Sequence, residues 1–459
     1  MVIVYDVHKD QERKISGFVF WNQTRAFIIA LSLTCLTLAQ INSQIFTFTV
    51  ICMHDLVDHS SNETESHWIE GTTEKSVLFS ATAVGALIGL LPSATLINRL
   101  GVRLTLSICG LCSTIGTIFF PLSVALSFYL VVICRVLQGL GISMILTVLG
   151  IIPNSWCPST EYSTYLALLS SSLQLSNVVF MPVSGVLCDS SIGWRSIYYL
   201  FGFVTGVFFL IFYFFYNDEP HLHKNVSQKE LGAIQLGKTA QIREAVPYKK
   251  LITDKCVLVA WLGFIGGNLG FITLLLFGPT YLREVLHFDV KATGYINALP
   301  FFLCTFYKFG VGKISDRITF VSHKTIYTSW LLSSVGGLGL GYIVMAMTSD
   351  RLIAQIAFIF AIVASGLIIM GVVKCLQMRC LQHCHVTVSA MSFISYMVQF
   401  ISPLLVGLIC PDNTSEQWSK LFIYITIFMF ITNIPFPFLV TEEAAEYTKR
   451  KKNSDFSSC

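Results

Sequence analysis

The stretch LVVICRVLQGLGISMIL, residues 130–146, is apolar almost throughout and contains one arginine, Arg135. It belongs to a longer apolar run, 128–152. About 20 apolar residues suffice for a helix to cross a bilayer. A charge within such a helix is costly, and by default it indicates function. The stretch therefore predicts a membrane span and a buried cation that needs a partner.

The composition of the whole chain agrees with a membrane protein. Of its 459 residues, 54% are hydrophobic and only 12% are charged, whereas soluble domains carry about 25% charged residues. This excludes an ordinary soluble enzyme or binding module. The apolar runs long enough to span a bilayer number about twelve: 26–53, 77–97, 104–126, 128–152, 163–187, 195–216, 256–282, 292–312, 325–347, 352–373, 387–409 and 419–440.

The spans fall into two sets of six. The sequence predicts an all-α membrane protein of about 12 transmembrane helices in two six-helix halves. The first apolar run is too long for the core of a signal peptide, so we expect no cleaved leader. The predicted segments are an N-terminal tail 1–25, a first half 26–216, a polar linker 217–255, a second half 256–440 and a C-terminal tail 441–459.

The positive charges predict the orientation. With the N-terminus inside, 22 of the 30 Lys and Arg residues are cytoplasmic and six are outside, as the positive-inside rule requires. Both termini are therefore predicted to be cytoplasmic, in either the plasma membrane or a lysosomal or vesicular membrane. The sequons at Asn62 and Asn413 fall outside and are predicted to be glycosylated, whereas those at Asn22 and Asn225 are predicted to be bare.

Inside the predicted spans the charges are all positive. Arg135 and Lys308 lie there, while all 26 Asp and Glu residues lie in loops or tails. With no protein anion at hand, we expect the partner of Arg135 to be an anionic substrate. The alternatives are that Arg135 snorkels to the surface or binds backbone carbonyls. Lys308 lies near the inner end of its predicted span and is expected to snorkel to the cytoplasm.

Neutral polar residues supply further candidates for a substrate site. Gln40 and Gln44 share one face of the first span, Gln174 lies in the fifth and Asn268 in the seventh. Such residues face other helices or a water-filled path rather than lipid. We expect these four to donate hydrogen bonds to the substrate; interhelical hydrogen bonding is the alternative.

Two cytoplasmic loops repeat one pattern at corresponding places. "LINRLGVR" follows the second span and "GKISDRITF" follows the eighth. Both resemble the loop signature of the major facilitator superfamily, Gly-x-x-x-Asp-Arg-x-Gly-x-Arg/Lys. That resemblance implies a transporter whose halves rock around a central site. The loops are then expected to latch the cytoplasmic gate through Asn98, Arg99, Arg103, Asp316 and Arg317.

Further segments resemble one family within that superfamily. They are "RVLQG" at 135–139, "MPVSG" at 181–185, "GWRSIYYLFG" at 193–202, "NALPF" at 297–301 and "SPLLVG" at 402–407. They are similar to the anion transporters that include sialin, the vesicular glutamate transporters and the sodium-phosphate transporters. The resemblance implies a secondary transporter of small organic or inorganic anions, with Arg135 at a position linked to anion binding.

The chain departs from that family at charged positions. Ser43 and Gly267 stand where members often carry arginine, Ile142 where proton-coupled members carry glutamate, and Asn98 where the loop carries aspartate. The usual proton carrier is therefore missing. Coupling to Na⁺ or H⁺, facilitated diffusion, and a sensor that keeps the fold without transport all stay open.

The remaining motifs do not predict catalysis or metal binding. Cys109 and Cys112 form a C-x-x-C inside an apolar helix, where packing is the expected role, and "CLQHCH" at 380–385 has no second ligand pair. We expect no enzyme, no metal, no cofactor beyond a coupling ion and no nucleic-acid partner. The expected partners are a small anion and the lipid bilayer, with the oligomeric state open. Cys52, Cys188 and Cys410 lie near the outer face, where a disulfide stays open.

Overall fold

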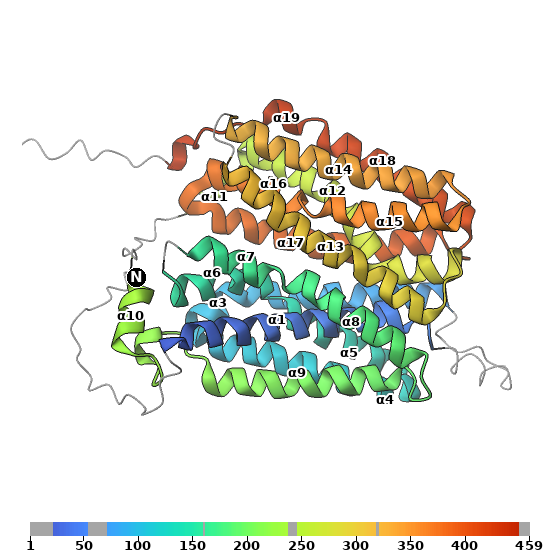
Figure 1. Cartoon of the computed structure of the whole chain (residues 1–459), viewed down its shortest axis with the longest axis horizontal. Helices are drawn as coiled ribbons and strands as arrows, with labels where there is room; N and C mark the ends of the chain where they lie inside the picture. Colours follow the sequence, from blue (N-terminus) through green and yellow to red (C-terminus); the bar gives the residue numbers. More distant parts are fainter. Residues whose placement is uncertain (1–21, 54–70, 159–160, 237–245, 318–320, 449–459) are drawn as a thin grey trace, which may run out of the picture.

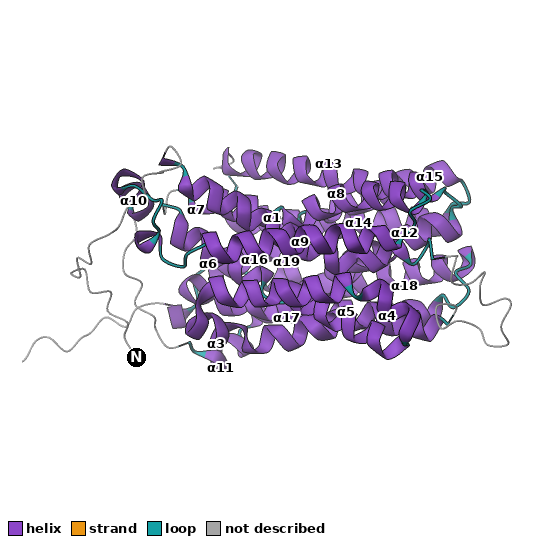
Figure 2. Cartoon of the chain, turned by 90° about the horizontal axis from the view of Figure 1, so that it is seen from below, coloured by secondary structure: helices purple, strands orange, loops and turns teal. Residues whose placement is uncertain are grey.

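A computed structural model of the chain describes residues 22–53, 71–158, 161–236, 246–317 and 321–448. These residues form helices and loops, with no strand among them. The helices run roughly side by side in one elongated bundle (Figures 1 and 2). Ten helical segments of the described residues, some of them made of two adjoining helices, are long and apolar enough to cross a membrane. The predicted all-α membrane fold is confirmed.

The two predicted halves are the blue-to-green and yellow-to-red layers of Figure 1. The first comprises α1 (Thr24–Thr49), α3 (Thr72–Ile118), α4 (Phe120–Leu126), α5 (Phe128–Ile142), α6 (Ile145–Trp156), α7 (Tyr162–Ser170), α8 (Ser172–Cys188) and α9 (Arg195–Phe215). Between the halves lie α10 (Gln228–Gln235) and α11 (Tyr248–Thr253). The second comprises α12 (Lys255–Thr280), α13 (Val290–Arg317), α14 (His323–Met347), α15 (Arg351–Ser365), α16 (Ile368–Cys380), α17 (Cys384–Ile409), α18 (Ser415–Asn433) and α19 (Phe436–Leu439).

Helix α3 contains the second predicted span and most of the third, on either side of a sharp turn at Gly101. The backbone there has φ 80° and ψ 170°, a conformation that glycine adopts without strain. The Asp218 carboxylate accepts hydrogen bonds from the amides of Val102 (2.7 Å) and Arg103 (3.1 Å), where the second limb begins. A side chain on Gly101 would collide with that carboxylate. The turn thus needs both the glycine and the aspartate.

The fourth and tenth predicted spans are broken helices. In each, a first limb of 15 residues ends, at Ile142 and at Ser365. The second limbs, α6 and α16, begin at Ile145 and Ile368. The two breaks lie at corresponding places in the two halves, which the sequence patterns did not predict. Discontinuous helices in transporters recur at binding sites because a break exposes helix termini.

The two halves meet mainly near their outer ends. Thr72 on α3 donates to the carbonyl of Pro411 (3.2 Å), and Ser80 donates to the carbonyl of Phe400 on α17 (2.9 Å). Helices α8 and α13 also lie side by side, and a Cβ on Gly294 would lie 2.6 Å from the Met181 carbonyl. The backbones of α8 and α13 therefore approach closely, and the outer side is closed.

A disulfide joins Cys52 and Cys188, just beyond α1 and at the end of α8, and Cys410 is a free, buried thiol. The pairing that the sequence left open is thus Cys52 with Cys188. Disulfides persist in oxidising compartments. The pair therefore agrees with the predicted placement of these ends outside the cytoplasm.

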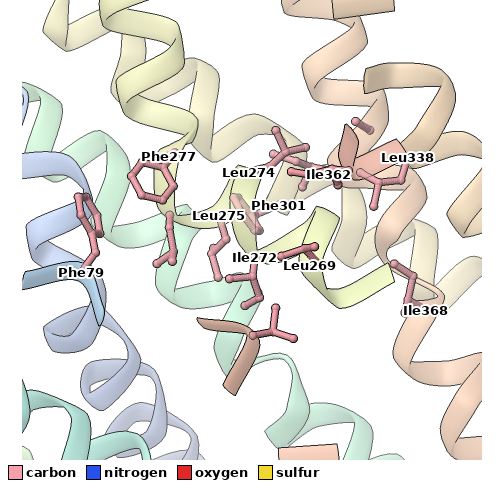
Figure 3. Packing of buried hydrophobic residues seen from close by; sticks show 14 of the residues in the cluster. Phe79, Leu269, Ile272, Leu274, Leu275, Phe277, Phe301, Leu338, Ile362 and Ile368 are labelled. Atoms are coloured by element: carbon pink, nitrogen blue, oxygen red, sulfur yellow. The ribbon is translucent and has the colours of Figure 1, made fainter. Parts of the chain in front are cut away.

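The apolar core follows the same division. One cluster runs through the second half and across to the outer part of the first, where the Phe79 and Phe277 rings lie 4.7 Å apart. Figure 3 shows these two rings facing each other beside Leu274 and Leu275. A separate cluster fills the inner part of the first half, and Tyr396 is its one member from the second half among the described buried residues. The halves thus share a core at the end of the bundle that is predicted to lie outside, and they have separate cores toward the end that is predicted to be cytoplasmic.

Candidate functional site

Arg135 lies on α5, about 10 Å below the outer end of that helix, and its side chain is 1% exposed. Its Nε donates to the carbonyl of Leu78 on α3 (3.1 Å). Its Nη1 donates to the carbonyl of Ser43 on α1 (3.1 Å) and to Gln138 Oε1 (2.6 Å). The guanidinium carbon lies 5.2 Å from the centre of the Phe46 ring. One cation therefore ties three helices together.

These contacts exclude one of the alternatives for Arg135. The side chain is buried and bound to backbone carbonyls, so it does not snorkel. Gln138 in turn donates a hydrogen bond to Thr117 Oγ1 (3.1 Å), which extends the network of hydrogen bonds around Arg135. Three of the five guanidinium N–H groups are used, and Nη2 has no hydrogen-bond partner among the described residues. Contact between Arg135 and a substrate stays a prediction.

A small cavity lies between the halves, deeper than Arg135. Its polar lining is Gln174 from α8, Asn268 from α12, Lys308 from α13, and Ser365 at the end of α15. The open volume is about 20 Å³, room for about one water molecule. The bundle as described is thus closed around this point. The full lining is Leu173, Gln174, Asn268, Phe271, Phe301, Cys304, Lys308, Ser365, Gly366, Ile368 and Ile369.

The cavity brings together two of the predicted site residues. Gln174 and Asn268 are each 4% exposed, and Asn268 Nδ2 donates to Ser395 Oγ (3.3 Å). Gln40, Gln44 and Arg135 do not line this cavity. Gln44 is 4% exposed, and its Oε1 has no hydrogen-bond partner.

The expected snorkelling of Lys308 is wrong. Helix α13 continues to Arg317, so Lys308 lies about 13 Å from its inner end rather than beside it. Its side chain lines the cavity and has no hydrogen bond or ion pair with any described residue. A Cβ on Gly366 would lie 3.4 Å from Lys308 Cε. The break at Gly366 thus makes room for the lysine.

Three of the departures from the anion-transporter pattern have a place in the packing. Ser43 is 3% exposed, and its carbonyl receives Arg135. A Cβ on Gly267 would lie 3.1 Å from Ile368 Cγ2, so an arginine there would require the Ile368 side chain to shift. At the break after α5, Tyr396 Oη donates to the carbonyl of Ile142 (2.8 Å) across the two halves. No sequence pattern indicates this role of Tyr396, because its partner is a backbone atom.

The predicted gating residues of the first loop contact their own half. Arg103 Nε donates to the carbonyl of Tyr213 (2.6 Å), and its guanidinium lies over the Tyr213 ring. Asn98 and Arg99 are exposed. Asp316 and Arg317 end α13, and their side chains lie outside the described part of the chain. A latch between the two loops stays a prediction.

The inner end of the second half is fixed by the segment after α19. Asp254 caps α12 and pairs with Arg379 Nε (2.8 Å), and Tyr447 Oη donates to the same carboxylate (3.2 Å). Burial, with the Cys380 thiol and the Asp254 carboxylate nearby, raises the pKa of Tyr447, which keeps the phenol protonated as a donor. Within "CLQHCH", Cys380 belongs to this cluster, because its thiol contacts Tyr447 Oη.

The predicted glycosylation sites are placed only in part. Asn413 lies in the turn after α17, and its Oδ1 accepts from Trp418 Nε1 (3.3 Å). Asn62 lies outside the described residues. Glycosylation of both stays a prediction.

Comparison with known proteins places this arrangement among transporters. The family model described as Major Facilitator Superfamily matches residues 26–407. Sialin of Ovis aries is 24% identical over 348 residues, covering 74% of this chain and 69% of that protein. Sodium-dependent phosphate transport protein 1 of Homo sapiens is 21% identical over 392 residues, covering 83% of each.

A solved structure shares the fold. The bacterial homolog of the human lysosomal transporter Spinster, in an inward-facing and occupied conformation, superposes with a TM-score of 0.67 at 15% identity. The match covers 90% of this chain and 96% of the other.

Proposed function

The chain belongs to the Major Facilitator Superfamily, and we propose that it is a secondary transporter of small anions that works by alternating access of its two halves. The observation that carries the proposal is the sign of the charges inside the bundle, where Arg135 is buried and Lys308 half-buried. Arg135 and Lys308 lie within the bundle, and every described Asp and Glu lies at a helix end or in a loop. A membrane interior with cations alone favours an anion as the transported solute.

The arrangement of the halves supports alternating access. The outer ends are closed by α3 with α17 and by α8 with α13, whereas the inner core of the first half stands apart. The break after α5 contacts α17 of the other half through Tyr396, and the break after α15 lines the cavity between the halves; broken helices also occur at the binding sites of other transporters built from repeats. The similarity to sialin, and to a relative named as a phosphate transport protein, points the same way.

For coupling, the proposal favours Na⁺ over H⁺. No described carboxylate within the spans is available to carry a proton, and one relative is named a sodium-dependent transport protein. Both termini are proposed to be cytoplasmic, with glycans on Asn62 and Asn413, and the loops around Asn98 and Asp316 are proposed to meet in the outward-facing state.

Uptake of a panel of labelled anions into vesicles tests the proposal. The panel contains phosphate, urate, sialate, glutamate and an aromatic carboxylate, each with and without a sodium gradient. The expected result is saturable uptake of at least one anion above that of empty vesicles, stimulated by sodium. Uptake no greater than in empty vesicles for the whole panel would contradict anion transport.

A non-transporting sensor is the second candidate. It is favoured by the missing charges at Ser43 and Gly267 and by the small size of the cavity. Saturable anion binding to purified protein without flux in the same preparation would select it.

A further inference from the structure

We infer that Lys308, with the first turn of α16, forms the anion-binding site of the central cavity, and that this site takes a singly charged anion whose remainder is apolar. The inference rests on the proposed function and names the site and the ligand class. It assigns the substrate contact to a residue that the sequence patterns left aside.

The Lys308 ammonium has no partner within the described part of the protein. It lies in a cavity between the halves, and no described carboxylate or hydrogen-bond acceptor contacts it. The lysine is half-buried, and withdrawing a charged group from water without a partner is unfavourable. An anion that enters the cavity would supply the missing partner through a charge-assisted hydrogen bond.

The break in the tenth span brings the N-terminus of α16 to the same cavity. The first turn of α16 lines the same cavity through Ile368 and Ile369. The first N–H groups of a helix have no intrahelical acceptor, and the helix dipole makes this end positive. Gly366 leaves space for the stem of Lys308 beside that terminus. The lysine and the helix terminus thus lie on one wall of the cavity.

The wall of the cavity opposite Lys308 belongs to the first half of the chain. Gln174 comes from α8 of the first half, whereas Lys308 and α16 belong to the second. The two halves therefore hold different parts of the site, and rocking them apart would open it. Such an arrangement couples occupancy to the movement, because an anion seated between Gln174 and Lys308 touches both halves at once.

The ligand class follows from the lining. The cavity has one charged side chain, a few neutral polar groups, and otherwise apolar walls that include Phe271 and Phe301 (the latter shown with Ile368 in Figure 3). A phosphate dianion would bring a second negative charge for which the lining holds no cation. Once the halves rock apart and enlarge the cavity, a monocarboxylate with an aromatic or aliphatic body would match both the single ammonium and the apolar walls.

The test compares Lys308→Met with Lys308→Arg. Methionine keeps an unbranched stem and removes the charge, whereas arginine keeps the charge. Lys374→Gln is the matched control, since Lys374 is an exposed lysine on α16 outside the cavity. The wild type and the three variants are assayed for uptake of labelled benzoate, with unlabelled benzoate, phosphate and glutamate as competitors.

The expected result is a tenfold or greater loss of benzoate uptake in Lys308→Met at normal amounts of folded protein. Lys308→Arg should recover part of the uptake and Lys374→Gln should match the wild type, with benzoate competing better than phosphate. Equal uptake in Lys308→Met and the wild type would overturn the site. Loss of folded protein in Lys308→Met would also overturn it, because the site requires a lysine without a structural partner.

A second readout separates the site from the proposed function. If the wild type takes up none of the anions, transport fails, and the site is judged by thermal stabilisation of purified protein by benzoate. Stabilisation of the wild type that disappears in Lys308→Met supports the site. Equal stabilisation in both proteins, or none in either, overturns it.

Discussion

Arg135 and Lys308 are both cations inside the bundle, yet their surroundings differ in nearly every respect. Arg135 lies near the outer end of α5, where its guanidinium makes three hydrogen bonds within the protein and faces the Phe46 ring. Lys308 lies deeper, on the wall of a cavity, and has no such bond. A buried charge that the protein satisfies organises helices. One that the protein leaves unsatisfied is available to a ligand.

The largest expected effect comes from Arg135→Gln. The substitution removes three charge-assisted hydrogen bonds, and we expect the free energy of unfolding to fall by about 2–4 kcal/mol. Thermal unfolding in detergent measures this loss, with Lys308→Met as the comparison, which should change by less than about 1 kcal/mol. If Arg135→Gln unfolds like the wild type while Lys308→Met unfolds early, the roles of the two cations are reversed.

The second prediction concerns the disulfide at the outer ends of α1 and α8, on the side of the bundle where Arg135 lies. The disulfide Cys52–Cys188 holds α1 and α8 together on the outer side, and such a bond contributes about 2–4 kcal/mol by restricting the unfolded chain. Cys52→Ser should therefore lower the unfolding temperature. The uptake rate per folded molecule should fall by a smaller factor than the equilibrium constant for folding. Cys112→Ser, at a free and half-buried thiol, is the control. A maleimide mass shift at Cys188 in unreduced wild type would show that the bond is absent.

The third prediction narrows the space around Lys308. A methyl group on Gly366 would lie 2.6 Å from Cys304 Sγ and 3.4 Å from Lys308 Cε, so Gly366→Ala crowds the cavity at a cost of about 1–3 kcal/mol. We expect several-fold weaker uptake with a raised KM. Gly336→Ala has nothing within 4 Å of the added methyl and should behave as the wild type. Equal KM values for the two variants would separate Gly366 from the site.

The smallest effect is expected at the contact between the halves. Tyr396→Phe removes the hydrogen bond to the carbonyl of Ile142, worth about 1 kcal/mol. Because the bond is present in the structure with its outer side closed, its loss should lower the population of that state relative to the outward-facing state about fivefold, as measured by distances between spin labels on the inner ends of the two halves. Tyr424→Phe, at an exposed tyrosine of α18, is the control. A shift of the same size in both variants would argue against Tyr396 as a contact that holds the halves together.

Much of the fold could be predicted because it depends on local properties of the sequence. The apolar runs and the excess of positive charge follow from the free energy of moving side chains into lipid. The charge census also found both cations. What it did not predict is where each one points, since this depends on neighbours from other segments, such as the carbonyl of Leu78 for Arg135.

The details of the site depend on breaks and on backbone atoms. The interruptions after Ile142 and Ser365 lie within uniformly apolar runs, where periodicity gives no signal. Asp218 meets the amide of Val102 across 116 residues. Gln174 and Asn268 were predicted from polarity alone, and their shared cavity with Lys308 emerges only from the packing of α8, α12 and α13.

The anion site at Lys308 is best tested by an experimental structure with bound 4-iodobenzoate, because the iodine marks the ligand. We expect iodine density inside the cavity between the halves, with the carboxylate within hydrogen-bonding distance of Lys308 Nζ and the first turn of α16. A carboxylate bound instead to Nη2 of Arg135, with Lys308 left unpaired, would contradict this expectation.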